Sequence, residues 1–240
     1  MTRLQTARGG SRGPGRPPPA IRLLFVCAAY AALFPPVSPA QESGLDPAAR
    51  ANPNDRLDAT AWSIMASKGW SNYQTLGRTV RFIFDYAGED VYALDVAYTI
   101  SPETGFGGFF DRHLAARFQV AGKLSARAQE SRDWIPEFSA YFALRWRRLP
   151  WNHVVATSLA IGEGLSIVGA IPEVEILTTE RGGTNNLLNY LMLEATFALP
   201  SQPRVQLVSR IDHRSGMFGV FNDAVESGSN TVALGIRVNW

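Results

Sequence analysis

Residues 92–100 read Tyr-Ala-Leu-Asp-Val-Ala-Tyr-Thr-Ile, and residues 138–146 read Phe-Ser-Ala-Tyr-Phe-Ala-Leu-Arg-Trp. In both stretches apolar side chains occupy every second position, and the positions between them are mostly small, polar or charged. Alternation with a period of two is typical of a β-strand with one apolar and one polar face. These stretches therefore predict strands, and their pattern can be followed through the rest of the chain.

The same alternation recurs and predicts eight strands, at 80–86, 92–100, 114–124, 138–146, 155–161, 187–197, 205–211 and 232–240. Their polar faces carry Arg81, Asp85, Asp95, Arg117, Lys123, Arg145, Glu194, Arg210, Asp212 and Arg237. An eight-stranded barrel has room inside for side chains but not for two large aromatic layers. A charged interior and an apolar exterior suit a lipid bilayer. The expected fold is all-β: an eight-stranded antiparallel transmembrane barrel of the outer-membrane type, with a structural ion-pair network inside.

The first 40 residues have the features of a secretory signal peptide. Residues 1–22 hold five arginines and no acidic residue, 23–34 are apolar or aromatic, and small residues precede a cut near Ala40. This order predicts export rather than a membrane anchor, because twelve apolar residues are too few to span a bilayer as a helix. Cys27 lies inside this segment, so the mature chain holds no cysteine.

Cleavage also changes the charge balance of the chain. The whole chain has 23 basic and 21 acidic residues, and loss of the five arginines leaves 18 against 21. The mature chain is therefore slightly acidic, and nothing in it points to nucleic acid. We expect residues 41–70 to form a mostly irregular periplasmic lead-in, with a short element around 61–67, and residues 71–240 to form the barrel. The terminal Trp240 resembles the aromatic residue that outer-membrane barrels present to the barrel assembly machinery.

The most informative polar pair is His213 and Ser215, at the end of the seventh predicted strand. Residues two apart on a strand share a face, with Cα atoms ~6.5–7 Å apart. Both continue the apolar parity of that strand and so face lipid, where an adjacent base could activate the serine. If Arg204 lies at the periplasmic rim, the nine residues to His213 form a strand that is tilted by ~40° and rises about 23 Å. Because the apolar band is ~25 Å tall, His213 is expected near the outer headgroups.

The segment His213-Arg214-Ser215, followed by a loop and a final strand, resembles the lipid A 3-O-deacylase (PagL) family of outer-membrane barrels. The resemblance covers about 205–240 and implies an ester hydrolase that removes a hydroxyacyl chain from lipid A with a Ser-His-Glu triad. It makes Ser215 the nucleophile, His213 the base and Glu226 the acid, with Asn222 four residues before Glu226 at the oxyanion. Gly216 stands where the family has Asn, and its N–H could also serve the oxyanion. Asp223 and Asp212 are alternative acids.

The resemblance implies lipid A, or lipopolysaccharide, and outer-membrane lipids as partners, and no cofactor. No cluster of residues has metal-ligand spacing. Two other functions stay open. The first is a non-enzymatic barrel with a structural, adhesive or stress-response role, in which His213 and Ser215 are merely residues at the rim. The second is a soluble lipocalin-like carrier, whose strands would show the same alternation of apolar and polar side chains. His113 and His153 are expected to be structural.

Overall fold

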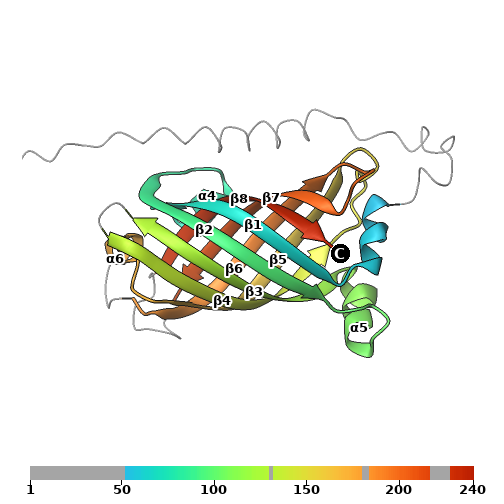
Figure 1. The fold of residues 1–240 in the computed structure, drawn as a ribbon, viewed down its shortest axis with the longest axis horizontal. Coiled ribbons are helices and arrows are strands. Elements are labelled where there is room, and N and C mark those ends of the chain that lie inside the picture. Colours follow the sequence, from blue (N-terminus) through green and yellow to red (C-terminus); the bar gives the residue numbers. More distant parts are fainter. Residues whose placement is uncertain (1–51, 130–131, 180–183, 217–227) are drawn as a thin grey trace, which may run out of the picture.

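The computed structural model describes residues 52–129, 132–179, 184–216 and 228–240. Its strands are β1 Trp62–Asn72, β2 Tyr86–Thr99, β3 Arg117–Gln129, β4 Arg132–Trp146, β5 Ala156–Val168, β6 Leu187–Ala198, β7 Val205–Ser215 and β8 Gly228–Asn239. Neighbouring strands pair antiparallel in chain order, and β1 pairs with β8, so that the sheet closes into a barrel (Figure 1). The eight-stranded barrel expected from the sequence is confirmed.

The barrel closes where the two ends of the described chain meet. Trp62 and Trp240 exchange two backbone hydrogen bonds of 3.1 and 3.0 Å. The ring of Trp62 also lies 4.9 Å from that of Tyr98, between centroids. We call this side of the barrel the termini end, and the opposite side, where β7 finishes at Ser215, the far end.

The first strand differs from the sequence prediction. Residues 80–86 do not form it: Val80 ends the short helix α4 Leu76–Val80, and Tyr86 already belongs to β2. Between them, residues 81–85 form a turn in which Phe82 adopts a left-handed φ of 61°. The first strand is β1, which begins inside the range assigned to the lead-in. Its alternation was hard to see because Lys68 shares the outward face, where it pairs with Asp90 at 2.7 Å.

Four shorter elements lie at the two ends of the barrel. The 3-10 helix η1 Pro53–Ala59 and helix α5 Gly105–Leu114 lie at the termini end, and α4 and α6 Glu173–Thr178 lie at the far end (Figure 1). α5 fills the long connection between β2 and β3, and its Phe106 and Phe110 rings pack on Phe118 of β3 at centroid distances of 5.0 and 4.8 Å. Over the described ranges, no helix is long and apolar enough to cross a membrane.

The lumen is filled by charged side chains that pair with one another. Glu194 accepts hydrogen bonds from Arg145, at 2.5 Å, and from Arg210, at 2.5 and 2.8 Å. It also accepts a hydrogen bond of 2.8 Å from Arg237. Asp95 accepts from Arg210 at 2.8 Å. All five side chains are buried, and such pairing satisfies charges that would be costly to bury alone.

The predicted lumen residues are confirmed with two exceptions. Asp95, Arg117, Lys123, Arg145, Glu194, Arg210, Asp212 and Arg237 are all buried. Arg81 is exposed and Asp85 is partly exposed, because both belong to the turn between α4 and β2 and not to a strand of the barrel. The network also includes Glu137, which accepts from Arg127 at 2.6 Å.

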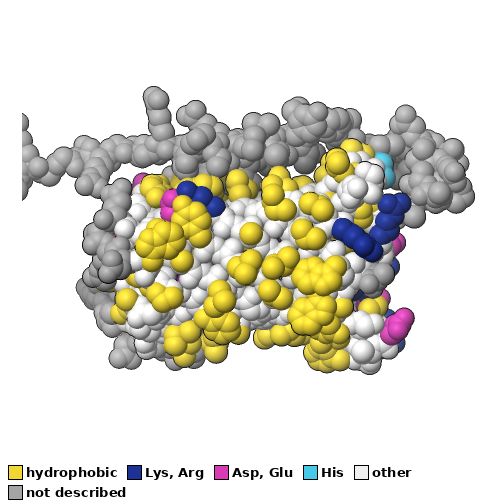
Figure 2. Space-filling view, viewed as in Figure 1, with side chains coloured by type: hydrophobic (Ala, Val, Ile, Leu, Met, Phe, Trp, Pro, Cys, Tyr) yellow, Lys and Arg dark blue, Asp and Glu magenta, His cyan; other side chains and the backbone are white. Residues whose placement is uncertain are grey.

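The outer surface of the barrel is apolar. Exposed large side chains alternate along the strands and include Ile64, Leu94, Val96, Val120, Leu124, Phe142, Leu159, Ile161, Leu165, Leu207 and Ile236. Figure 2 shows hydrophobic side chains spread over the barrel wall, with few charged ones between them. A surface of this kind is stable in hydrocarbon and unfavourable in water. The barrel is therefore inverted relative to a soluble protein, as a transmembrane barrel must be.

Candidate functional site at the far end of β7

Strand β7 carries His213 and Ser215 on its outward face. Exposure alternates along the strand, so that Val205 and Leu207 face outward while Arg210 faces the lumen. His213 and Ser215 continue the outward series and are half-buried. Their placement follows the parity of the strand, and it puts an imidazole and a hydroxyl side by side at the membrane surface of the barrel.

The imidazole of His213 is held by a neighbouring strand. Its Nδ1 lies 2.9 Å from Oδ1 of Asn230, which is its partner in the β7–β8 register. The Nδ2 of Asn230 donates to the carbonyl oxygen of Gln74 at 2.8 Å, which fixes the amide orientation. Because the amide oxygen can only accept, Nδ1 must carry the proton. Nε2 then keeps a free lone pair, which a general base requires.

Ser215 lies at the edge of a closely packed backbone. It pairs with Gly228, whose φ of +147° and position leave no room for a side chain. A Cβ added at Gly228 would lie 1.8 Å from the carbonyl oxygen of Arg214 and 3.0 Å from Cα of Ser215. Thr178 of α6 donates to the Gly228 carbonyl at 2.9 Å. His213 and Ser215 do not share a hydrogen bond in this structure, a contact that often tightens only on substrate binding.

The lumen side of the same segment is anchored by Arg214. Its Nη1 donates to Oε1 of Glu175 at 2.6 Å, and its Nη2 donates to the carbonyl oxygen of Asn186 at 3.0 Å. Ser229 also donates to Glu175, at 2.9 Å. Burial raises the pKa of the Glu175 carboxyl above its ordinary value, although Arg214 beside it acts in the opposite direction. The backbone between His213 and Ser215 is thus fixed from the inside by α6.

The other residues that the sequence assigned to the site fall into three groups: described next to Ser215, outside the described residues, and facing the lumen. Gly216 is described and buried directly after Ser215. Asn222, Glu226 and the alternative acid Asp223 lie outside the described residues. Asp212 is wrong as an acid for His213, because it faces the lumen, where it accepts from Lys123 at 2.9 Å and from Tyr190 at 2.5 Å.

Two features near His213 were not recognised from the sequence. Asn230 lies on the outward face of β8, opposite His213, and the connection that contains Gln74 and α4 covers it. Asn72 pairs with Asn230 from β1 and donates to Thr79 of α4 at 3.2 Å. Asn230 could have been noticed because it is a polar residue at a strand position where the alternation calls for an outward, apolar side chain. His213 was identified by the same criterion.

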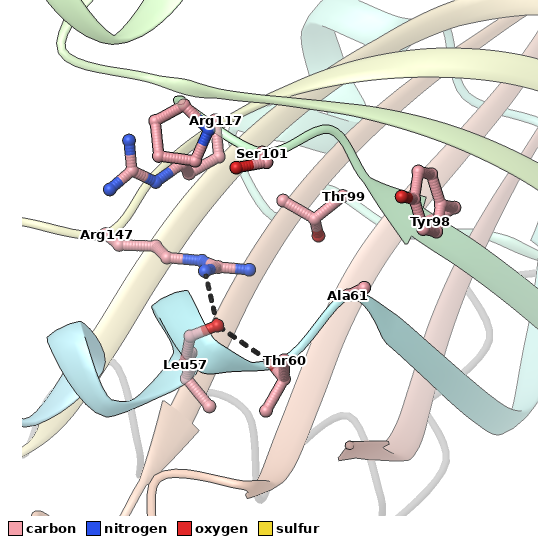
Figure 3. Close-up of a pocket in the computed structure, with 9 residues that line it drawn as sticks. Leu57, Thr60, Ala61, Tyr98, Thr99, Ser101, Arg117 and Arg147 are labelled. Atoms are coloured by element: carbon pink, nitrogen blue, oxygen red, sulfur yellow. Dashed lines mark hydrogen bonds between the residues drawn. The ribbon is translucent and has the colours of Figure 1, made fainter. Parts of the chain in front are cut away.

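A small cavity lies at the termini end, away from His213. It measures about 90 Å³ and is bounded by η1, the end of β2, Arg117 and Arg147 (Figure 3). Arg147 and Thr60 both donate to the carbonyl oxygen of Leu57, at 3.3 and 2.8 Å. The side-chain amide of Asn54 donates hydrogen bonds to the carbonyl oxygens of Arg147 and Thr157, at 3.0 and 2.8 Å. These contacts indicate that η1 closes the lumen at this end.

Fold and surface together define a class: the chain is a small, closed, eight-stranded transmembrane β-barrel. No family model matches the sequence, and no curated protein sequence matches it. Solved structures with a similar fold include the outer membrane enzyme PagL, at 11% identity over 73% of this chain and 98% of that chain, with a TM-score of 0.42. Neisserial surface protein A is 12% identical over 75% of this chain and 97% of that chain, with a TM-score of 0.43. The Yersinia pestis outer membrane protein Ail is 14% identical over 75% of this chain and 99% of that chain, with a TM-score of 0.37. These likenesses concern the fold alone.

Proposed function

We propose that this protein is an ester hydrolase of the bacterial outer membrane that removes an ester-linked hydroxyacyl chain from lipid A. The observation that carries the proposal is the outward-facing pair of His213 and Ser215 at the far end of β7. A barrel that only spans the membrane gains nothing from an imidazole and a hydroxyl on its apolar face, because polar groups are costly there.

The position of the pair fits a substrate that lies in the membrane. The far end of β7 lies across the apolar wall from the termini end, which we assign to the periplasm. The pair then lies at the level where the acyl chains of an outer-leaflet lipid meet its headgroup. Ester bonds of lipid A are found at this level, so the substrate can reach Ser215 without leaving the membrane.

The proposed mechanism uses the free Nε2 of His213. Nε2 takes the proton of Ser215 while Oγ attacks the ester carbonyl carbon, and the oxyanion forms near the Gly216 N–H and Asn222. The tetrahedral intermediate collapses, and His213 returns the proton to the leaving sugar hydroxyl. Water then attacks the acyl-enzyme, again through His213, and releases the hydroxy fatty acid. The family resemblance implies Glu226 as the acid of the triad, whereas Nδ1 of His213 is bonded to Asn230 in this structure.

The test is mass spectrometry of lipid A from cells that express the wild-type protein, Ser215→Ala or Ser209→Ala. Ser209 lies on the same outward face of β7 and is also half-buried, but it is six residues, ~20 Å, from Ser215. We expect loss of one hydroxyacyl chain with the wild type and with Ser209→Ala, and none with Ser215→Ala. Identical lipid A from all three folded proteins would instead favour a non-enzymatic barrel.

A further inference from the structure

We infer that Asn230 is the positioning residue for His213, so that an amide rather than a carboxylate stands behind the base. This inference rests on the proposed function, in which Nε2 of His213 takes the proton of Ser215. The Nδ1 nitrogen, which the acid of a triad would need, is already bonded to Asn230 at 2.9 Å.

The direction of the hydrogen bond follows from the second contact of the amide. Nδ2 of Asn230 donates to the Gln74 carbonyl at 2.8 Å, which leaves Oδ1 to face His213. Asn230 is 6% exposed, so water does not compete for either end of the amide. The neutral imidazole is thereby held as the Nδ1–H tautomer, although the Nε2–H form is usual for a free histidine. Asn230 thus selects the form of His213 that can accept a proton from Ser215.

The amide is itself held in place by three segments. In the strand registers, Asn230 lies between His213 on β7 and Asn72 on β1. Asn72 accepts from the backbone N–H of Gln74 at 2.7 Å, and so fixes the carbonyl-bearing residue to which Asn230 donates. A side chain fixed in this way needs no further ordering when substrate binds, which is what a positioning residue contributes.

The setting also explains why an amide fits here better than an acid. The His213–Asn230 pair is on the outward side of the barrel, toward the membrane, where an ionised carboxylate is costly. The charged residues next to His213 in the chain, Asp212 and Arg214, face the lumen, where they are paired with Lys123 and Glu175. Asparagine can hold an imidazole without adding a charge, and Cys-His-Asn hydrolases use the same arrangement.

The test is the tautomer of His213, read from imidazole ¹⁵N chemical shifts of the full-length protein in detergent micelles. The chain has three histidines, so loss of one signal in His213→Gln assigns it. We expect a protonated Nδ1 and an unprotonated Nε2 in the wild type at neutral pH. Asn230→Ala should shift the population toward the Nε2–H form, while Asn230→Asp, which keeps an acceptor, should retain the Nδ1–H form.

Two further variants separate Asn230 from its alternatives. Glu226→Gln should leave the tautomer unchanged, because Asn230 and not Glu226 holds Nδ1. Ser209→Ala should also leave it unchanged, because Ser209 lies on the same face of β7 but four residues, ~13 Å, before His213. An Nε2–H wild type, or a tautomer that responds to Glu226→Gln or Ser209→Ala as strongly as to Asn230→Ala, would overturn the inference.

Lipid A deacylation provides the second readout. We expect Asn230→Ala to lower the rate on the order of 10²-fold, the lower range for loss of acid–base function, and Asn230→Asp to recover most of it. Deacylation that persists in Ser215→Ala would refute the proposed function and leave the tautomer result standing. A rate unaffected by Asn230→Ala, with deacylation still dependent on Ser215, would refute only the role of Asn230.

Discussion

Replacing Glu194 by Gln tests whether the charged lumen stabilises the barrel. Glu194 is the shared acceptor of three buried arginines, Arg145, Arg210 and Arg237. After the change only Arg210 keeps a carboxylate partner, Asp95. Removal of one partner of a buried pair costs about 3–5 kcal/mol, because a charge is left uncompensated. We take a loss of about 4 kcal/mol, within that range, because two arginines lose their carboxylate at once while the side-chain volume hardly changes.

The free energy of unfolding is measured by urea titration of the protein refolded in detergent, with tryptophan fluorescence as the signal. At an m-value of ~2 kcal/mol/M, a loss of ~4 kcal/mol lowers the midpoint by roughly 2 M. Glu163→Gln is the matched control, because Glu163 lies at an outward position of β5 and is only partly buried. Adding Arg237→Met to Glu194→Gln should recover part of the loss. Equal midpoints for Glu194→Gln and Glu163→Gln would refute the reasoning.

Two further outcomes are expected. Gly228→Ala should distort the far end of β7, because the new Cβ would lie 1.8 Å from the Arg214 carbonyl oxygen. Labelling of Ser215 by a fluorophosphonate should therefore fall at least ~10-fold. The control is Gly122→Ala, whose new Cβ meets only a ring atom at 3.8 Å, and this variant should be labelled normally. Since the folded-state pKa of Glu175 is raised, its contribution to stability is full below its unfolded pKa and is lost as pH rises through the folded pKa. Urea midpoints from pH 4 to pH 7 should therefore fall more steeply for the wild type than for Glu175→Gln, and parallel curves would contradict this.

Most of the barrel could be predicted from the sequence because its strands have two chemically different faces. In β2, Leu94 and Val96 face outward while Asp95 faces the lumen, and the sequence of this part of the strand shows the difference directly. The first strand was missed for the opposite reason. Lys68 lies outward and Met65 lies inward, so alternation is weak, whereas the apolar side chains of the turn that includes Phe82 imitate a strand.

The site was predictable only along one strand. Parity places His213 and Ser215 together because both belong to β7. The partner of His213 comes from β8 and its anchor from the connection after β1, and both depend on strand register. Register is set by the closed barrel as a whole, so Asn230 could not be identified until the ladders were known.

The ion pairs of the lumen join segments that are remote in the chain. Asp95 and Arg210 are 115 residues apart, and Lys123 and Asp212 are 89 apart. In a partly assembled sheet these groups would face lipid singly, at a cost of a few kcal/mol each. Insertion and closure are therefore expected to occur together, in one cooperative step. A half-formed wall should not persist in the membrane, and β1 and β8 should meet while the charges are still sheltered from hydrocarbon.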